Sequence, residues 1–158
     1  MALPACHSFA QFKVEQNKAG QFWLNTHLTQ RSGDMFLGVP YNVSSYSLLT
    51  IMLARVLGYN TGEFSHIIVD AHIYEDHMDA VEEYLDSPNE RYPLLEFSQK
   101  YLEYEKKVKD ALNNGVDFKL LLTTINNWIN SIDYNDIQLK GYLGNKVIKA
   151  KLHTGKKS

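Results

Sequence analysis

The spacing of apolar residues changes twice along the first half of the chain, and these changes constrain the fold more than any other feature. Between residues 8 and 29 apolar and polar side chains alternate, and the polar stretch at residues 17–20 interrupts the alternation. Two alternating segments around a short polar break predict an antiparallel hairpin. Apolar residues then recur at helical spacing over residues 43–57, and Gly58 marks the end of that helix. Alternation returns over residues 63–74, which predicts a further strand.

The second half is expected to be mainly helical. Residues 78–85 have the pattern of a short amphipathic helix, and residues 97–112 repeat apolar side chains at spacings of three and four. Asp117 precedes another such run and is a candidate N-cap. Residues 97–132 therefore predict an αα-hairpin, and residues 136–142 are expected to form a final strand.

Between the hairpin and the first helix, Gly33, Gly38 and Pro40 are expected to interrupt regular structure. The patterns together predict one α+β domain over residues 1–158, in which a mixed or antiparallel sheet packs against helices. A helical segment occupies the last third of this domain. A chain of 158 residues is long enough to bury one hydrophobic core.

The composition excludes several classes of protein. A net charge of −2 gives no general attraction to nucleic acid or to an anionic membrane. The sequence has no apolar run of about 18 residues and no signal-peptide pattern. The single cysteine excludes an intramolecular disulfide and a multi-cysteine zinc site. We therefore expect a cytoplasmic protein with neither nucleic acid nor a membrane among its partners.

The candidate chemistry lies in two places, at Cys6 and within residues 30–42. A cysteine attacks carbon as a thiolate, which a neighbouring arginine favours over the neutral thiol. Arg31 also offers a planar fork of donors that suits phosphate, and the Ser32 hydroxyl lies beside it. The Asn42 amide pairs an acceptor with a donor, which matches the N3–H and O4 of uracil and not the reversed pattern of cytosine. Together these groups predict a site that holds and attacks a phosphorylated pyrimidine.

Simpler structural roles are open for the same residues. A lone cysteine is commonly a buried, inert side chain. Arg31, Ser32 and Asp34 could form an ordinary solvated turn. Asn42 precedes the predicted helix and could be its N-cap. A capping side chain could not also read a base, so the two roles of Asn42 compete.

A histidine and a tyrosine form a further candidate pair. His72 and Tyr74 stand two apart on the predicted strand, so they share one face about 6–7 Å apart and could both hydrogen-bond a sugar hydroxyl. The alternative is a buried histidine and a buried tyrosine. Residues of metal-ligand type are also scattered here: His66, Asp70, His72, Asp76 and His77. Their spacing is not the i, i+4 helical pattern of zinc enzymes, so the sequence predicts no metal site.

Three blocks stand in a fixed order along the first half of the chain. They are residues 3–12 (LPACHSFAQF), residues 30–46 (beginning QRSGD, with YN at 41–42 and SY at 45–46) and residues 70–74 (DAHIY). In order and spacing these blocks closely resemble the C-terminal, nucleophile-bearing half of the thymidylate synthase family. The resemblance is strong over residues 3–88 and weaker over residues 136–150, which look like the family's closing strand and tail.

The resemblance implies synthesis of thymidylate from deoxyuridylate (dUMP), with 5,10-methylenetetrahydrofolate as one-carbon donor and reductant and with no metal. It makes Cys6 the nucleophile that adds to C6 of the uracil ring. It places His7 in the water network beside this nucleophile, and it implies that Asn42 hydrogen-bonds the edge of the uracil ring. Arg31 and Ser32 would bind the phosphate, and Gly33 and Asp34 would make further contacts with the substrate. His72 and Tyr74 would bind the deoxyribose hydroxyl. Asp34, Gly38 and Tyr41 would lie on the folate side.

Departures from the family pattern leave alternatives open. The family's chain is nearly twice as long, and the part before the nucleophile strand, with its proton-transfer glutamate, is absent here. Residues 97–132 exceed the connection usual in the family, and residues 151–154 replace its small apolar tail. We therefore expect a domain that is incomplete at its N-terminus and works as a homodimer or with a complementing chain that carries the first half. The alternatives are a pyrimidine hydroxymethylase of the same family, and an inactive fragment or one chain of a split enzyme that binds nucleotide or a partner.

Overall fold

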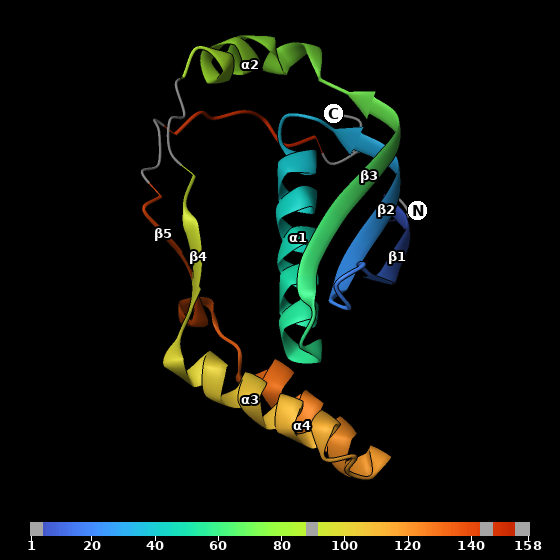
Figure 1. The fold of residues 1–158 in the computed structure, drawn as a ribbon. Helices are drawn as coiled ribbons and strands as arrows, with labels where there is room; N and C mark the ends of the chain where they lie inside the picture. The colour runs from blue at the N-terminus through green and yellow to red at the C-terminus, as the bar shows by residue number, and fades with distance from the viewer. Residues whose placement is uncertain (1–4, 88–91, 143–146, 154–158) are drawn as a thin grey trace.

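A mixed three-stranded sheet forms the first half of the fold (Figure 1). The structure is a computed structural model that describes residues 5–87, 92–142 and 147–153. Strand β1 (His7–Gln16) pairs antiparallel with β2 (Phe22–Asp34), which confirms the predicted hairpin. Strand β2 pairs in parallel with β3 (Asn60–His72), so the sheet order is β1-β2-β3.

Helix α1 (Gly38–Leu57) joins the two parallel strands and covers one face of β2 and β3. The alternation read from the sequence places Leu24 and Leu28 on this face, where both are buried. Full burial of one such leucine stabilises the fold by about 1.5–3 kcal/mol. Ala54 of α1 is fully buried as well, because its small side chain lets helix and sheet approach closely.

Helix α1 begins five residues before the predicted start at residue 43. Pro40 falls in the first turn, where a backbone N–H has no partner within the helix, so proline does not break it. The Asp34 carboxylate accepts hydrogen bonds from the backbone N–H groups of Phe36 and Leu37, at 3.0 and 3.3 Å, and so completes the turn that leads into the helix. At the other end Gly58 adopts φ 72°, as predicted for a helix stop.

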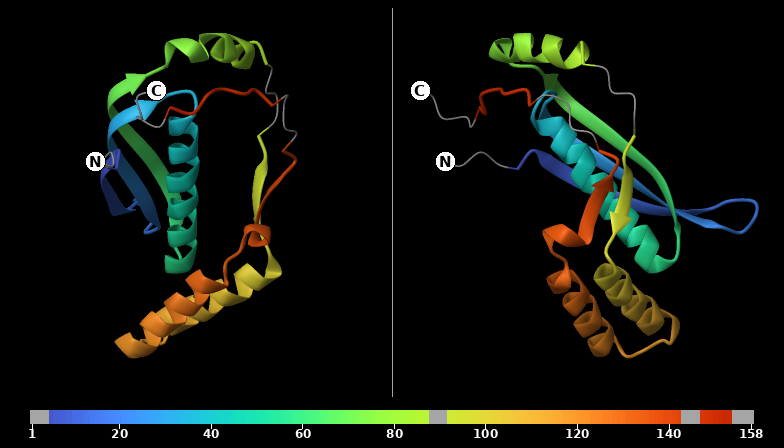
Figure 2. Two further views of the ribbon diagram at one scale, coloured as in Figure 1. Left: turned by 180° about the vertical axis from the view of Figure 1, so that it is seen from behind. Right: turned by 90° about the vertical axis from the view of Figure 1, so that its left-hand side faces the viewer.

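The predicted helical hairpin of the last third is confirmed. It is flanked in sequence by the two strands of a second, small sheet. Helices α3 (Gln99–Asn113) and α4 (Phe118–Ser131) run between β4 (Leu94–Phe97) and β5 (Ile137–Lys140), which pair antiparallel (Figure 1). Asp117 caps α4, as the sequence predicts, by accepting hydrogen bonds from the next turn. Helix α2 (Met78–Leu85) crosses near the opposite end of α1 from this hairpin, as the two further views also show (Figure 2).

Two expectations for the C-terminal part need correction. The final strand covers Ile137–Lys140 only, and it pairs with β4, which the sequence did not reveal, rather than with the main sheet. Residues 141–142 and 147–150 of the expected closing strand and tail are not in a strand, and residues 143–146 lie outside the described residues. Strand β4 has only four residues, which is too short for a clear alternation.

Hydrogen bonds hold the base of the helical hairpin together. The Lys100 ammonium lies 2.9 Å from carboxylate oxygens of both Asp133 and Asp136. Donation by the Ser98 hydroxyl, and then by the Asp133 N–H and Lys100, lowers the pKa of Asp136 to about 2. The carboxylate of Asp136 thus remains ionised and ties the start of α3 to the turn before β5.

The helical hairpin is anchored on the C-terminal end of α1. Val56 of α1 is buried in one cluster with Tyr101, Val108 and Trp128 of the hairpin. Beside this cluster the Arg55 guanidinium makes two hydrogen bonds to the Glu105 carboxylate, at 2.9 and 3.3 Å. The Lys109 ammonium lies 2.7 Å from the same carboxylate. An apolar contact and a charge pair therefore join the two halves of the chain.

The sheet face opposite α1 is left open. The side chains of β1 are exposed along the whole strand, and the hairpin of β1 and β2 extends beyond the helix (Figure 2, right). Phe9, Ile67 and Val69 lie on the open side with 53% to 75% exposure. Among the described residues, no helix is long and apolar enough to span a membrane.

We expect Glu105→Ala to lower the free energy of unfolding by about 2 kcal/mol. Loss of one partner of a fully buried ion pair costs about 3–5 kcal/mol, and the cost here is smaller because the Arg55 and Lys109 side chains are about a third exposed and can be hydrated. Urea unfolding monitored by circular dichroism measures the change. Glu103→Ala, an exposed position on the same helix, is the matched control and should change stability by less than about 0.5 kcal/mol. Equal midpoints for the two variants would contradict the anchoring role of Glu105.

Candidate active site

The predicted site residues gather at one end of the main sheet. Asp34 pairs with His72 where the parallel strands β2 and β3 end, and His7 pairs with Gln30 where the antiparallel strand β1 begins. Helix α1 starts beside the same end, four residues after Asp34. The ends of three strands and the start of one helix therefore bring together residues that are far apart in the sequence.

Cys6 and Arg31 are neighbours across the hairpin. The Arg31 backbone N–H donates a hydrogen bond to the Cys6 carbonyl oxygen at 2.9 Å. Cys6 is partly exposed, unlike the fully buried cysteine of the structural alternative. The ring of His7 is held from α1, because its Nδ1 lies 3.3 Å from the Tyr46 hydroxyl and the two rings meet edge to face. The nucleophile candidate and its histidine neighbour are thus positioned by β2 and α1.

A buried glutamine sets the orientation of several polar groups. The Nε2 group of Gln30 donates to the Ser32 carbonyl oxygen at 2.8 Å and to Asn42 Oδ1 at 3.0 Å. A backbone carbonyl can only accept, so the amide nitrogen of Gln30 must lie on this side. Its oxygen then faces the Nε2 of His66 at 3.0 Å, and this nitrogen must carry a proton. The Ser32 carbonyl thereby fixes the orientation of the Gln30 and Asn42 amides and the protonated nitrogen of the His66 ring.

The alternative role of Asn42 as a helix cap is wrong. Helix α1 includes Asn42 in its second turn, and its N-cap residue is Leu37, which makes no side-chain capping bond. The Asn42 Oδ1 atom is held by Gln30, so its Nδ2 group points away from that bond. No hydrogen bond among the described residues uses this Nδ2 group. The carboxamide is therefore oriented and still has a donor to offer.

Three more of the predicted residues flank the short turn between β2 and α1. Gly33 is buried, and a Cβ atom there would lie 2.9 Å from a methyl of Val39 and 3.0 Å from one of Ile68. Glycine at this position allows the end of β2 to pack closely against α1 and β3. Asp34 holds the turn through Oδ1, and Gly38 is the first residue of α1. The structure thus gives Gly33 and Asp34 clear local roles, whereas their ligand roles stay predictions.

His72 and Tyr74 lie close together, although they do not share a strand. Strand β3 ends at His72, and Tyr74 precedes the short 3-10 helix η1 (Glu75–His77). Their rings meet edge to face with centroids 5.1 Å apart. The Nδ1 atom of His72 lies 3.3 Å from the Asp70 carbonyl oxygen. The chain turns at the end of the strand, and this turn brings the two rings together.

A groove of about 810 Å³ opens beside the turn, between the start of α1, helix α2 and the C-terminal segment. Leu37 and Tyr41 line it from α1, Tyr84 from α2 and Ile148 from the C-terminal segment. The Tyr41 side chain is 74% exposed. This volume lies in the range of sites that hold small organic ligands, and its lining is mostly apolar.

Sequence reasoning missed Gln30, His66 and Tyr46 as parts of the site. The available signal was the position of Gln30 on the same strand face as Leu28, where a polar side chain is buried and needs partners. Its partners on β3 and α1 could not be read from spacing, because they come from elements 12 and 36 residues away.

The sequence of this chain is similar to those of known proteins. The thymidylate synthase family model matches residues 1–154. The thymidylate synthase of Mycoplasma mobile is 41% identical over 152 residues, which cover 96% of this chain and 42% of the relative. The bifunctional dihydrofolate reductase-thymidylate synthase of Zea mays is 47% identical over 121 residues, which cover 77% of this chain and 21% of the relative. The thymidylate synthase of Listeria monocytogenes serotype 4b is 47% identical over 100 residues, or 63% of this chain and 30% of the relative.

These matches place the chain in a family of nucleotide-metabolising enzymes. The chain belongs to the thymidylate synthase family, which confirms the resemblance read from its three sequence blocks. The chain spans about two fifths of the length of the Mycoplasma relative.

We expect His66 to make the folded chain less stable in mild acid. Burial, with smaller contributions from positive charge on His7 and His27, lowers the pKa of His66. Below about pH 6.5 the unfolded chain therefore binds a proton that the folded chain resists, so stability falls as the pH falls. In His66→Gln, which retains a donor for Gln30, the loss of stability between pH 7.5 and 5.5 should be smaller. Urea midpoints at the two pH values measure it, and an identical decline in both proteins would exclude His66 as the cause.

Proposed function

We propose that this chain is the nucleophile-bearing part of a thymidylate synthase, which methylates dUMP reductively to thymidylate. The Cys6 thiolate adds to C6 of the uracil ring, which makes C5 an enolate-like carbon nucleophile. 5,10-Methylenetetrahydrofolate supplies the one-carbon unit and the reducing equivalents. The observation that carries the proposal is the pairing of Cys6 with Arg31 across the hairpin, at the sheet end where α1 presents Asn42.

The orientation of Asn42 supports uracil as the base. Gln30 fills one lone pair of the Asn42 Oδ1 atom and leaves the other to accept the N3–H of uracil. The Nδ2 group of Asn42 can then donate to O4. A cytosine would turn its 4-amino group toward this Nδ2 donor. It would therefore bind only if the amide flipped, and a flip would break the bond from Gln30.

The rest of the nucleotide has candidate partners at the same end of the sheet. Arg31 and the Ser32 hydroxyl are proposed to bind the phosphate, since guanidinium and hydroxyl donors suit its oxygens. His72 and Tyr74 are proposed to bind the deoxyribose hydroxyl, and their close rings are a compact pair for this purpose. Gly33 contributes the close packing that keeps these residues in place.

The groove beside α1 supports the folate side of the reaction. Tyr41 and neighbouring apolar residues offer surface to a flat aromatic ring system. Asp34 directly precedes Met35, which lines this groove, and its carboxylate is proposed to bind the pterin. Gly38, between the lining residues Leu37 and Pro40, is proposed to lie on the same folate side. A free thiol nucleophile and a reduced co-substrate suit a reducing compartment, so we propose that the protein works in the cytoplasm.

Covalent labelling tests the role of Cys6 directly. With 5-fluoro-dUMP and methylenetetrahydrofolate, the wild type should form an adduct that mass spectrometry places on Cys6, and Cys6→Ser should form none because a hydroxyl is too weak a nucleophile. Arg31→Ala should still form the adduct but need at least tenfold more nucleotide, since a charge-assisted bond contributes about 1.5–3 kcal/mol. An adduct on the serine variant would refute the assignment. So would absence of an adduct on the wild type when a chain carrying the first half of a relative is also present.

We also propose that the open sheet face binds a second copy of the chain. Phe9, Ile67 and Val69 would be buried from water on association. The second copy would then pack against the open face of the hairpin next to Cys6. Sedimentation equilibrium should therefore detect a dimer, and Ile67→Lys should dissociate it. Leu122→Lys, at an exposed apolar position on α4, is the control and should remain dimeric. A monomeric wild type that dimerises only with a chain carrying the first half of a relative would favour the complementing chain instead.

A further inference from the structure

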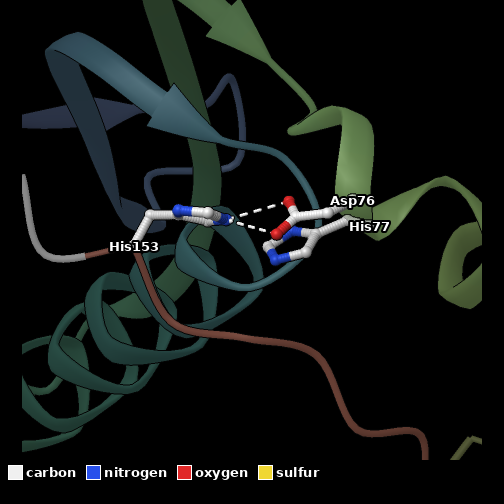
Figure 3. A group of neighbouring side chains, drawn as sticks. All are labelled: Asp76, His77 and His153. Carbon is white, nitrogen blue, oxygen red and sulfur yellow. Dashed lines mark hydrogen bonds and ion pairs between the residues drawn. The ribbon is translucent and has the colours of Figure 1, made fainter. Parts of the chain in front are cut away.

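Two histidines and an aspartate converge at a place that the proposed function does not use (Figure 3). Asp76 and His77 come from the 3-10 helix η1, and His153 comes from the C-terminal segment more than 70 residues later. Each offers one ligand atom, and these atoms all lie within 4.8 Å of one another. Imidazole nitrogens and a carboxylate oxygen are the set that commonly binds a divalent transition metal.

His77 is prepared to bind a metal through one particular nitrogen. Its side chain is fully buried, and its Nε2 lies 2.7 Å from the Lys151 carbonyl oxygen. Because that carbonyl can only accept, Nε2 carries the proton, and in the neutral ring the lone pair lies on Nδ1. Within the described residues this Nδ1 is buried and has no hydrogen-bond partner. A backbone carbonyl that fixes the outer nitrogen of a histidine is the usual support of a metal ligand.

His153 and Asp76 complete the set from the more exposed side. The Nε2 of His153 lies 2.9 and 3.1 Å from the two carboxylate oxygens of Asp76 (Figure 3). Stacking on Tyr74, with ring centroids 4.0 Å apart, keeps the His153 ring in this orientation. The Asp76 side chain is half exposed, so an ion can enter from solvent.

We propose that Asp76, His77 and His153 bind a divalent transition-metal ion, for which Zn²⁺ is the best match. The ligands are His77 Nδ1, His153 Nε2 and an Asp76 oxygen, and water takes the fourth position. Binding moves the proton of the neutral His153 ring from Nε2 to Nδ1 through solvent, so that the Nε2 lone pair is free, and the metal replaces the hydrogen bond between His153 and Asp76. Two tetrahedral ligands of zinc lie about 3.4 Å apart, so this pair needs to open by only a few tenths of an ångström.

The bound ion would hold the C-terminal segment against η1. His153 and the Lys151 carbonyl belong to that segment, whereas Asp76 and His77 follow directly after Tyr74. The ion therefore acts as a link between two distant parts of the chain and has no role in bond making. This proposal stands on the cluster alone and does not depend on nucleotide chemistry. It departs from the sequence prediction of no metal site, which considered Asp76 and His77 without His153.

Metal titration of the untagged 158-residue chain tests the site. After treatment with a chelator, the wild type should bind one equivalent of Co²⁺ with the strong visible absorption of a four-coordinate ion, and Zn²⁺ should displace it. His153→Ala and Asp76→Ala should each weaken binding at least tenfold, because each removes a ligand. His27→Ala is the matched control, since His27 lies on the opposite face of the sheet and bonds Thr29, and it should bind as the wild type does. Circular dichroism checks that each variant is folded.

Proteolysis gives a second measurement that does not depend on spectroscopy. Zn²⁺ should slow tryptic cleavage after Lys151 at least tenfold in the wild type, because the Lys151 carbonyl is bonded to a metal-bound histidine. It should leave cleavage of His153→Ala unchanged. The proposal is refuted if the wild type shows no saturable Co²⁺ binding, or if wild type, His153→Ala and His27→Ala bind Co²⁺ equally.

Discussion

The packing of α1 on the parallel pair of strands is the constraint on which the rest of the structure depends. Leu28 and Ala54 are fully buried where helix and sheet meet, and the Thr26 and Thr50 hydroxyls hydrogen-bond at 2.7 Å in the same interface. The Thr50 hydroxyl donates to the Tyr46 carbonyl oxygen within the helix, so Thr26 is the donor between the two hydroxyls. A shift of the helix along the strands would leave the buried Thr26 hydroxyl without this partner. The start of α1 then presents Asn42 to the site, and its end presents Arg55 to the helical hairpin.

Precision at the site comes from a chain of hydrogen bonds that begins at a backbone carbonyl. The Ser32 carbonyl orients Gln30, which in turn orients Asn42 and His66. The oxygen and nitrogen ends of a side-chain amide have nearly the same shape. A partner that can only accept, or only donate, a hydrogen bond is therefore needed to fix which end faces it. The same logic operates at His77, where the Lys151 carbonyl decides which nitrogen keeps the proton. In both places the backbone determines the chemistry that a side chain can offer.

The chain buries one side of its sheet and leaves the other exposed. Strand β1, which directly follows the candidate nucleophile Cys6, is exposed along its whole length. A sheet with apolar side chains on an open face gains stability when another surface covers it. The Mycoplasma and Zea mays relatives are about two to four times as long as this chain, since the matched 152 and 121 residues cover 42% and 21% of them. The energetic support of the Cys6 hairpin is therefore expected to come from outside the described residues.

Local features of the sequence determined the elements and most of the candidate site. Alternation and helical spacing depend on neighbours in the chain, and they located the hairpin, α1, β3 and the αα-hairpin. The three blocks that contain Cys6, Arg31 with Asn42, and His72 with Tyr74 were enough to place the family. Tertiary structure alone decided that Asn42 lies inside a helix with its amide held by Gln30, and that His153 meets Asp76 and His77. These contacts join residues 12 to 77 positions apart, and no local period encodes such contacts because they depend on how whole elements pack.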